Sequence, residues 1–354
     1  MNKKNTIYLL IFAFIFLISV SVSAQSTLTV GEVTAKPGEK KSGFIQVPAG
    51  NESPAEQIPV TVVNGNRPGP VLALIAGTHG YEYPPVLALQ RVGKQLDAGQ
   101  LSGAVIIVHV MNMPSFMKRT IYYNPYDWQN QNRVFPGVED GTSSQRIAFQ
   151  ITKHVIDQCD YLIDNHCGDG NEDLMTYLYC TVTGNAEMDK KIRGLAENFG
   201  IKVMIHDTGR PTDAGASVYV SNTAILRGKP AMTTEVGGLG KTDEEYVQVL
   251  VEGNFNIMKH LNMIDGKPFI RTDPVWVTHY DILRSSHDGL FYPLVHKGHH
   301  VQKGEVIGYV TDFFGNVVEE AVAPYDGMLM YIIATPPMGK GEPMAMIGGF
   351  DNKR

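Results

Sequence analysis

The sequence predicts an α/β fold, a mixed sheet with helices on both faces, followed by a small all-β domain. Apolar runs at 71–76 and 104–110 are typical of buried strands, 231–235 reads as a further strand of apolar and small residues, and helical patterns lie between them. Strands that alternate with helices favour a layered α/β domain. After about residue 265 the sequence pattern changes, and 273–349 contains short strand patterns separated by Gly, Pro and Asn, without a convincing helix.

The elements of the first domain can be placed in chain order. Short strands and turns are expected over 28–63, and further strands at 71–76, 104–110, 161–164, 177–182, 202–205 and 231–235. Helices are expected at 84–98, 143–159, 189–199 and 242–261. Ser143 is the expected cap of the second helix, and Thr242 with Glu245 forms a capping-box pattern at the last. The segment 112–141 is long, polar and aromatic, and is expected to be a loop.

The N-terminus carries a targeting pattern. Lys3 and Lys4 precede an apolar run over 7–20, and Val22-Ser23-Ala24 offers small residues for cleavage. We interpret 1–24 as a signal peptide, because the apolar run is short for an uncleaved membrane anchor. The mature protein is then expected to be periplasmic or secreted.

Length and composition limit the remaining possibilities. A chain of 354 residues suits one large and one smaller domain, which we assign to 25–265 and 266–354. With 43% hydrophobic and 19% charged residues the chain reads as an ordinary globular protein, and a net charge of -6 argues against nucleic-acid binding. Three cysteines, Cys159, Cys167 and Cys180, do not make a disulfide framework. One pair could bridge, but buried thiols are favoured.

Three residues point to a metal site. His79 and Glu82 lie three apart just after the strand at 71–76, and His166 follows the strand at 161–164. Ligands in α/β folds gather at the carboxyl ends of strands, and two His with one Glu suit a catalytic zinc that keeps one position open. Asp164 could orient an imidazole. A capping carboxylate and surface or core histidines are the alternative interpretation.

Three further features fit hydrolytic chemistry. Asn132 and Arg133 lie in the long polar loop with Arg119 upstream, and arginine binds carboxylates with two hydrogen bonds. Glu235 ends a buried strand, where a carboxylate is costly unless it has a partner or a function such as general base. Ordinary surface charges or caps remain possible for each. Other undecided residues near the expected site are Tyr122, Tyr123, Arg210 and Arg227.

Four motifs in order resemble the succinylglutamate desuccinylase/aspartoacylase family of the zinc carboxypeptidase superfamily. They are Gly77-Thr78-His79-Gly80-Tyr81-Glu82, Asn132-Arg133-Val134-Phe135-Pro136-Gly137, Asp164-Asn165-His166 and Thr234-Glu235-Val236-Gly237-Gly238. The resemblance implies one Zn²⁺ per chain on His79, Glu82 and His166. It also implies that Glu235 activates water, that Arg119 polarises the scissile carbonyl, and that Asn132 and Arg133 hold a substrate carboxylate.

The same resemblance extends to the second domain. The segment 289–349 is similar to the barrel-sandwich modules that carry biotin or lipoate, but no lysine occupies a matching exposed turn, so we predict neither modification. In the family this domain can narrow access to the site.

The sequence thus predicts a zinc-dependent amidohydrolase that cleaves the amide bond of an N-acyl amino acid or a related carboxylate-bearing substrate. An exported metallocarboxypeptidase that acts on peptides or cell-wall fragments is the alternative with the same chemistry. A non-catalytic binding protein is a third possibility, which the complete set of ligands and base disfavours. The expected partners are small-molecule or short peptide substrates, without nucleic acid or stable membrane insertion.

Overall fold

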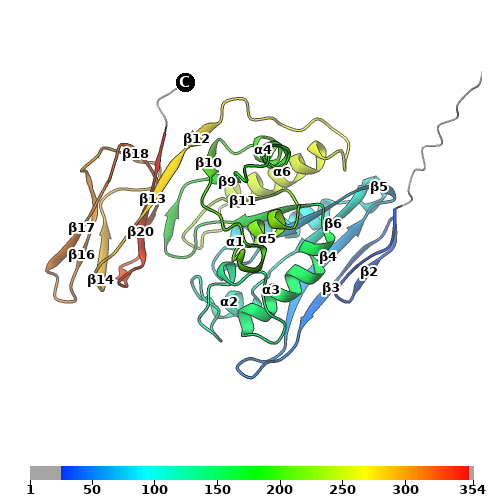
Figure 1. The fold of residues 1–354 in the computed structure, drawn as a ribbon, viewed down its shortest axis with the longest axis horizontal. Coiled ribbons are helices and arrows are strands. Elements are labelled where there is room, and N and C mark those ends of the chain that lie inside the picture. The colour runs from blue at the N-terminus through cyan, green and yellow to red at the C-terminus, as the bar shows by residue number, and fades with distance from the viewer. Residues whose placement is uncertain (1–24, 351–354) are drawn as a thin grey trace, which may run out of the picture.

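A computed structural model describes residues 25–350, and the predicted signal peptide lies outside the described residues. A nine-stranded mixed sheet forms its centre (Figure 1). In spatial order its strands are β12 (Val275–Val277), β10 (Val203–Asp207), β9 (Tyr177–Thr181), β11 (Ala231–Glu235), β7 (Tyr161–His166), β5 (Arg67–Ile75), β6 (Ser102–Val108), β4 (Glu56–Asn64) and β3 (Lys40–Val47). Pairing is parallel except at β11–β9, β6–β4 and β4–β3. The short strands β1 (Leu28–Val30) and β2 (Val33–Ala35) pair separately.

Helices cover both faces of this sheet, as predicted. They are α1 (Tyr83–Gln95), α2 (Met113–Lys118), α3 (Ser143–His154), α4 (Ala186–Phe199), α5 (Val220–Leu226) and α6 (Glu244–His260). On one face α6 packs against both α1 and α4, and Asn254 of α6 donates to the side chain of Asn165 in β7. On the opposite face α5 lies over β7 and β11, where Thr233 donates to Ser221. The α/β prediction is confirmed.

Several helix starts differ from the expectation because other residues cap them. α3 is capped by Thr142 rather than by Ser143, and the Gln145 side chain accepts from the Thr142 amide. α6 begins at Glu244 after Asp243, so the capping box expected from Thr242 is wrong. α4 starts earlier than predicted, because the Asn185 side chain accepts from two amides of the first turn.

Two helices had no sequence signal. α5 is buried at six consecutive positions, from Val220 to Ile225, so it shows no amphipathic period. α2 interrupts the predicted loop over 112–141 and spans six residues, too few for a period to appear. Neither helix was therefore predicted, and α2 lies within the segment expected to be a loop.

The C-terminal part consists of two further sheets, as the change of sequence pattern predicted. One contains β13 (His279–Arg284), β20 (Pro343–Gly349), β18 (Gly327–Ile333) and β15 (His300–Val301), and the other β17 (Val317–Val322), β16 (Val306–Thr311), β14 (Gly289–Pro293) and β19 (Pro337–Met338). They stand beside the large sheet (Figure 1). Two strand pairings join the C-terminal part to the first part. β12 pairs with β10 of the large sheet, and β8 (Glu172–Leu174), which follows His166, pairs with β18.

The three cysteines form no disulfide among residues 25–350. Cys159, Cys167 and Cys180 are free and buried, as favoured. Within residues 25–350 we find no helix with the length and apolar character that a membrane span requires.

Candidate active site

His79 and Glu82 lie in the turn that connects β5 to α1. β5 is apolar and buried over its last residues, and the chain then turns at Gly77, whose φ is +69°. Gly80 packs so closely against the backbone of Ser115 and Thr120 that no side chain fits there. Pro84 and Pro85 lie in the first turn of α1 and restrict the backbone conformation there. The local sequence therefore holds His79 and Glu82 at the carboxyl end of β5, and both are buried.

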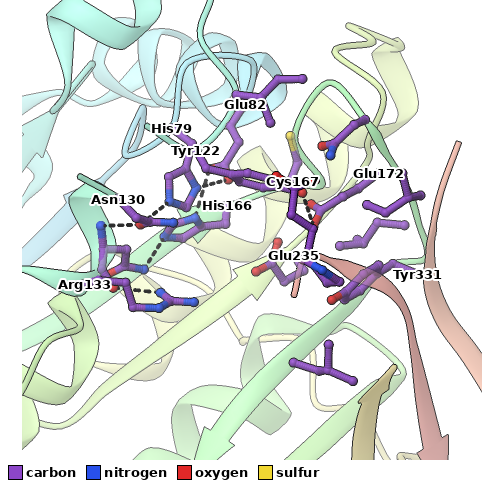
Figure 2. A pocket seen from close by; sticks show the side chains of 18 of the residues that line it. His79, Glu82, Tyr122, Asn130, Arg133, His166, Cys167, Glu172, Glu235 and Tyr331 are labelled. Carbon is purple, nitrogen blue, oxygen red and sulfur yellow. Dashed lines mark hydrogen bonds and ion pairs between the residues drawn. The ribbon is translucent and has the colours of Figure 1, made fainter. Parts of the chain in front are cut away.

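His166 reaches the same place from β7. It is the last residue of that strand and is directly opposite Glu235, the last residue of β11. Nδ1 of His79 is 2.6 Å from Oε1 of Glu82, and Nδ1 of His166 is 2.9 Å from Oε2. One ligand atom from each of the three residues lies within 4.8 Å of the others. Figure 2 shows the three side chains converging.

Both imidazoles have outward contacts that set their orientation. Nε2 of His166 lies 2.9 Å from Oδ2 of the buried Asp164, and Nε2 of His79 lies 3.1 Å from Oδ1 of Asn130. Burial lowers the pKa of His166, but the carboxylates of Asp164 and Glu82 outweigh burial and raise that pKa well above its usual range. The carboxylates thus compensate for a buried positive charge, whether a proton or a metal ion.

The three residues fit a zinc ion. Two imidazole nitrogens and one carboxylate form the donor set of His₂Glu catalytic zinc sites, which leave a position for water or substrate. Each oxygen of the buried Glu82 carboxylate faces one imidazole, Oε1 at 2.6 Å from His79 and Oε2 at 2.9 Å from His166, so the three donor groups converge as a metal site requires. Asp164 supplies the outer carboxylate that such a histidine usually has.

Glu235 faces the cavity beside this cluster. The cavity has a volume of about 680 Å³, and His79, Glu82, His166 and Glu235 all line it. Burial raises the pKa of Glu235 well above its usual range; His166 opposes this, and Glu82 and Glu172 raise the pKa further. The carboxyl of Glu235 thus lies beside the three candidate ligands, where a general base would act.

Asn132 and Arg133 also line the cavity. Both lie in a short 3₁₀ turn, Gln131–Arg133, where the Asn132 side chain accepts from the amide of Val220 at 2.9 Å. Its amide nitrogen lies 3.5 Å from Nε2 of His166. The guanidinium of Arg133 stacks on Tyr219 at 4.6 Å. The predicted proximity of these two residues to the metal ligands is therefore observed.

Arg119 is not brought to the cavity. It caps α2 in a left-handed conformation with φ +55°. Its side chain lines a separate hollow, whose other walls include Tyr83, Phe116 and Thr242. The predicted role in polarising a carbonyl has no geometric support, because the turn at the end of α2 directs this arginine away from the ligands.

Of the four residues whose role the sequence left undecided, three lie in the cavity and one does not. Tyr122, Tyr123 and Arg210 line the cavity, whereas Arg227 lies elsewhere and pairs with Asp157 at 3.0 Å. Arg210 is buried against Asp207, and its guanidinium stacks on Tyr219 at 4.4 Å. Because Arg133 stacks on the same ring, two guanidinium groups gather at one end of the cavity.

Two carboxylates of the site, the buried Asp169 and the half-buried Glu172, were not predicted from the sequence. Asp169 and Glu172 follow His166 in the stretch 167–173, and the acidic residues of that stretch were the available signal. Asp169 accepts from the amide of Tyr122 and Glu172 from its hydroxyl, each at 2.8 Å. Burial raises the pKa of Asp169 to about 6 and that of Glu172 to about 7.

The C-terminal sheets complete the cavity wall. The residues that they and their connections contribute are Ile282, Arg284, Tyr331, Ile333, Thr335, Pro337, Met338, Glu342 and Pro343. Figure 2 places Tyr331 near Glu172 and Glu235. The C-terminal part thus limits the space available to a substrate.

Comparison with known proteins agrees with this geometry. Residues 68–261 match the model of the succinylglutamate desuccinylase/aspartoacylase catalytic domain, which is more than half of the chain. The chain belongs to this family. It is also 31% identical over 317 residues to an N-alpha-acetyl-L-2,4-diaminobutyric acid deacetylase from Halomonas elongata, and the match covers 86% of this chain and 90% of that protein.

Solved structures share the fold over nearly the whole chain. A succinylglutamate desuccinylase/aspartoacylase from Rhodobacter sphaeroides has a TM-score of 0.77 at 24% identity, covering 89% of this chain and 96% of its own. The product-bound ectoine utilization protein of Ruegeria pomeroyi has a TM-score of 0.78 at 24% identity, with 92% and 98% covered. The family and the fold predicted from the four motifs are confirmed, and with them the prediction of an amide-hydrolysing enzyme.

Proposed function

We propose that this protein is a zinc-dependent deacylase that hydrolyses the amide bond of an N-acyl amino acid. The observation that carries the proposal is the buried cluster of His79, Glu82 and His166, with Glu235 paired opposite His166 on the next strand. The cluster offers a zinc site, and Glu235 offers a base within the same cavity.

His79, Glu82 and His166 would hold a zinc ion, which when bound would lower the pKa of water to about 7 and polarise the amide carbonyl. Glu235 accepts the proton of the attacking water, because its carboxylate lines the same cavity as the three candidate ligands and lies opposite His166. The same carboxyl then donates that proton to the leaving nitrogen. The products are a carboxylate and an amine.

The positive end of the cavity suits the carboxylate of an amino acid. Arg133 and Arg210 flank the ring of Tyr219 at 4.6 and 4.4 Å. Asp207 pairs with Arg210, whereas Arg133 has no ion pair with a carboxylate among residues 25–350. Arg133 therefore binds the substrate carboxylate with two hydrogen bonds, and Arg210 adds positive charge behind it.

The relatives support a small acylated amino acid as substrate. The Halomonas relative removes the acetyl group of N-alpha-acetyl-L-2,4-diaminobutyric acid, and its similarity spans both parts of this chain. A cavity of about 680 Å³ that the C-terminal sheets close suits a substrate of that size.

The test is Glu235→Gln in the zinc-loaded protein. We expect the variant to keep one zinc per chain and to lose at least about 100-fold in kcat on an N-acetyl amino acid, because the base is removed while the ligands stay. Metal analysis and a ninhydrin-type amine assay measure both. Near-normal turnover would falsify the assignment of Glu235 as base.

A substrate panel decides between deacylase and carboxypeptidase. N-acetyl, N-succinyl and N-formyl amino acids are compared with di- and tripeptides that carry the same terminal carboxylate. We expect turnover of the acyl amino acids alone, since residues such as Arg284 and Glu342 close the cavity wall. Faster cleavage of the peptides supports the metallocarboxypeptidase instead.

We also propose that the enzyme acts after export to the periplasm or medium. The support is the pattern of Lys3, Lys4, the apolar run 7–20 and the small residues before Gln25. N-terminal sequencing of the protein from osmotic-shock fluid is expected to begin at Gln25. Recovery of the uncleaved chain in the cytoplasm contradicts this proposal.

A further inference from the structure

The position of Arg119 leaves the scissile carbonyl without the donor that the family motif implied. Arg119 lines a different hollow, and Arg133 and Arg210 gather around Tyr219. The oxygen of a carbonyl gains negative charge as water attacks, and enzymes stabilise it with a donor positioned in advance. The segment that follows Arg119 contributes another group with a proton to donate, the phenol of Tyr122.

The backbone of Tyr122 is held in an unfavourable conformation. Its φ is +59°, a left-handed value that a non-glycine residue seldom adopts. The buried carboxylate of Asp169 accepts from its amide at 2.8 Å and holds the chain there. Strain that the surrounding structure maintains is typical of functional positions.

The side chain of Tyr122 is held just as firmly, next to the metal ligands. Its ring lies edge-on to the ring of His79, with centroids 6.1 Å apart and an interplanar angle of 88°. Its hydroxyl donates to Oε1 of Glu172 at 2.8 Å, and the other oxygen of Glu172 accepts from the amide of Asp169 at 2.9 Å. Figure 2 shows Tyr122 beside Glu82 and His166, with its hydroxyl directed to Glu172.

We propose that the hydroxyl of Tyr122 donates a hydrogen bond to the carbonyl oxygen of the scissile acyl group, the role that the motif assigned to Arg119. This inference rests on the proposed deacylase function. The proton reaches the substrate by rotation of the hydroxyl about its C–O bond, and no covalent bond changes. Glu172 keeps its hydrogen bond from Asp169 when the hydroxyl turns away.

Glu172 can also help the Tyr122 hydroxyl to change its hydrogen-bond partner from this carboxylate to the substrate. Burial raises its pKa to about 7, so a protonated carboxyl is accessible near neutral pH. In that form Glu172 donates to the phenol oxygen, and the phenol proton is free for the substrate. The same burial raises the pKa of Tyr122, which therefore stays a neutral donor.

The test compares Tyr122→Phe with the unchanged protein, both loaded with zinc. Phenylalanine keeps the ring against His79 and removes the hydroxyl alone. We expect kcat on an N-acetyl amino acid to fall about 10- to 100-fold with KM changed less than about threefold, the effect of losing one donor to the developing charge. Tyr83→Phe removes a hydroxyl outside the cavity and is the matched control, expected to match the unchanged protein.

A binding measurement supplies a readout that does not depend on turnover. Acetohydroxamate is a small metal ligand with a carbonyl oxygen, and calorimetry gives its dissociation constant. We expect Tyr122→Phe to raise that constant about tenfold, with zinc content and melting temperature unchanged. A variant that only loosened the fold instead loses zinc or melts earlier, and that result overturns the proposal.

The outcomes separate this inference from the proposed function. Tyr122→Phe that retains more than half of kcat and binds acetohydroxamate normally refutes the role of the phenol and leaves the deacylase assignment intact. Loss of turnover in Arg119→Gln with full activity in Tyr122→Phe returns the role to Arg119. Unchanged protein that binds acetohydroxamate but hydrolyses no N-acyl amino acid refutes the deacylase function, and the acetohydroxamate comparison still decides the contact.

Discussion

Replacing Asp164 with asparagine tests whether the buried cluster is a metal centre. Asp164 has no exposed surface, and its Oδ2 atom lies 2.9 Å from Nε2 of His166. When Nδ1 of His166 binds a metal, Nε2 must carry the proton, and Asp164 is the acceptor that stabilises this form. The asparagine variant keeps the shape of the side chain and loses the charge.

The expected magnitude follows from this burial. Loss of an outer partner of a metal-bound histidine lowers metal affinity about 10- to 100-fold, which is about 1.4–2.7 kcal/mol. We expect the upper end of this range, because Asp164 and His166 are both buried and water does not screen their interaction. The zinc dissociation constant is measured by competition with a chromophoric chelator.

The matched control is Asp157→Asn, which removes a half-exposed carboxylate that pairs with Arg227 on the surface. We expect this control to bind zinc as the unchanged protein does. A zinc affinity of Asp164→Asn within about threefold of the control contradicts the reasoning, since a metal-bound His166 needs its acceptor.

Three further predictions follow from the same site. Arg133→Lys is expected to raise KM about tenfold with little change in kcat, because a lysine cannot bind a carboxylate with two parallel hydrogen bonds; steady-state kinetics on an N-acetyl amino acid decides this. Gly80→Ala is expected to lower the free energy of unfolding by about 1–3 kcal/mol and to weaken zinc binding, because its new methyl group meets the backbone of Thr120 and Ser115. Urea denaturation and metal analysis measure the two effects. An unchanged urea midpoint counts against the packing argument. Zinc added at about 100 times its dissociation constant is expected to stabilise the metal-free protein by about 2.7 kcal/mol and to raise its melting temperature by several degrees. A melting temperature that calorimetry finds unchanged argues against a specific site.

The sequence predicts the metal cluster because its geometry follows from strand ends. His79 and His166 each come directly after an apolar run, and the carboxyl ends of parallel strands meet at one edge of a sheet. Glu235 ends a third predicted strand, and the structure pairs it opposite His166. The sheet order that makes these strands neighbours, with β7 between β5 and β11, was not predictable from the runs alone, although their common edge was.

The sequence motif alone does not determine where the side chain of Arg119 lies. Arg119 and Tyr122 are three residues apart, and only the path of the backbone decides which side chain enters the cavity. Both residues have positive φ, which no local pattern in the sequence indicates. Arg119 ends α2, and its amide donates to the carbonyl of Phe116. The amide of Tyr122 donates to Asp169, which lies in the segment after β7.

The short strand β8 explains why the two parts of the chain form one site. Successive residues of a strand point in opposite directions. Glu172 therefore faces the cavity and holds Tyr122, whereas Asp173 contacts Lys297 and His296 of the C-terminal part at 3.4 and 3.5 Å. Leu174 follows in the hydrophobic core that the C-terminal sheets build. Because β8 pairs with β18, the C-terminal sheets position the carboxylate that orients Tyr122, as well as forming the wall that limits substrate size. The second part of the chain thus acts on the chemistry through Glu172 and on selectivity through the cavity wall.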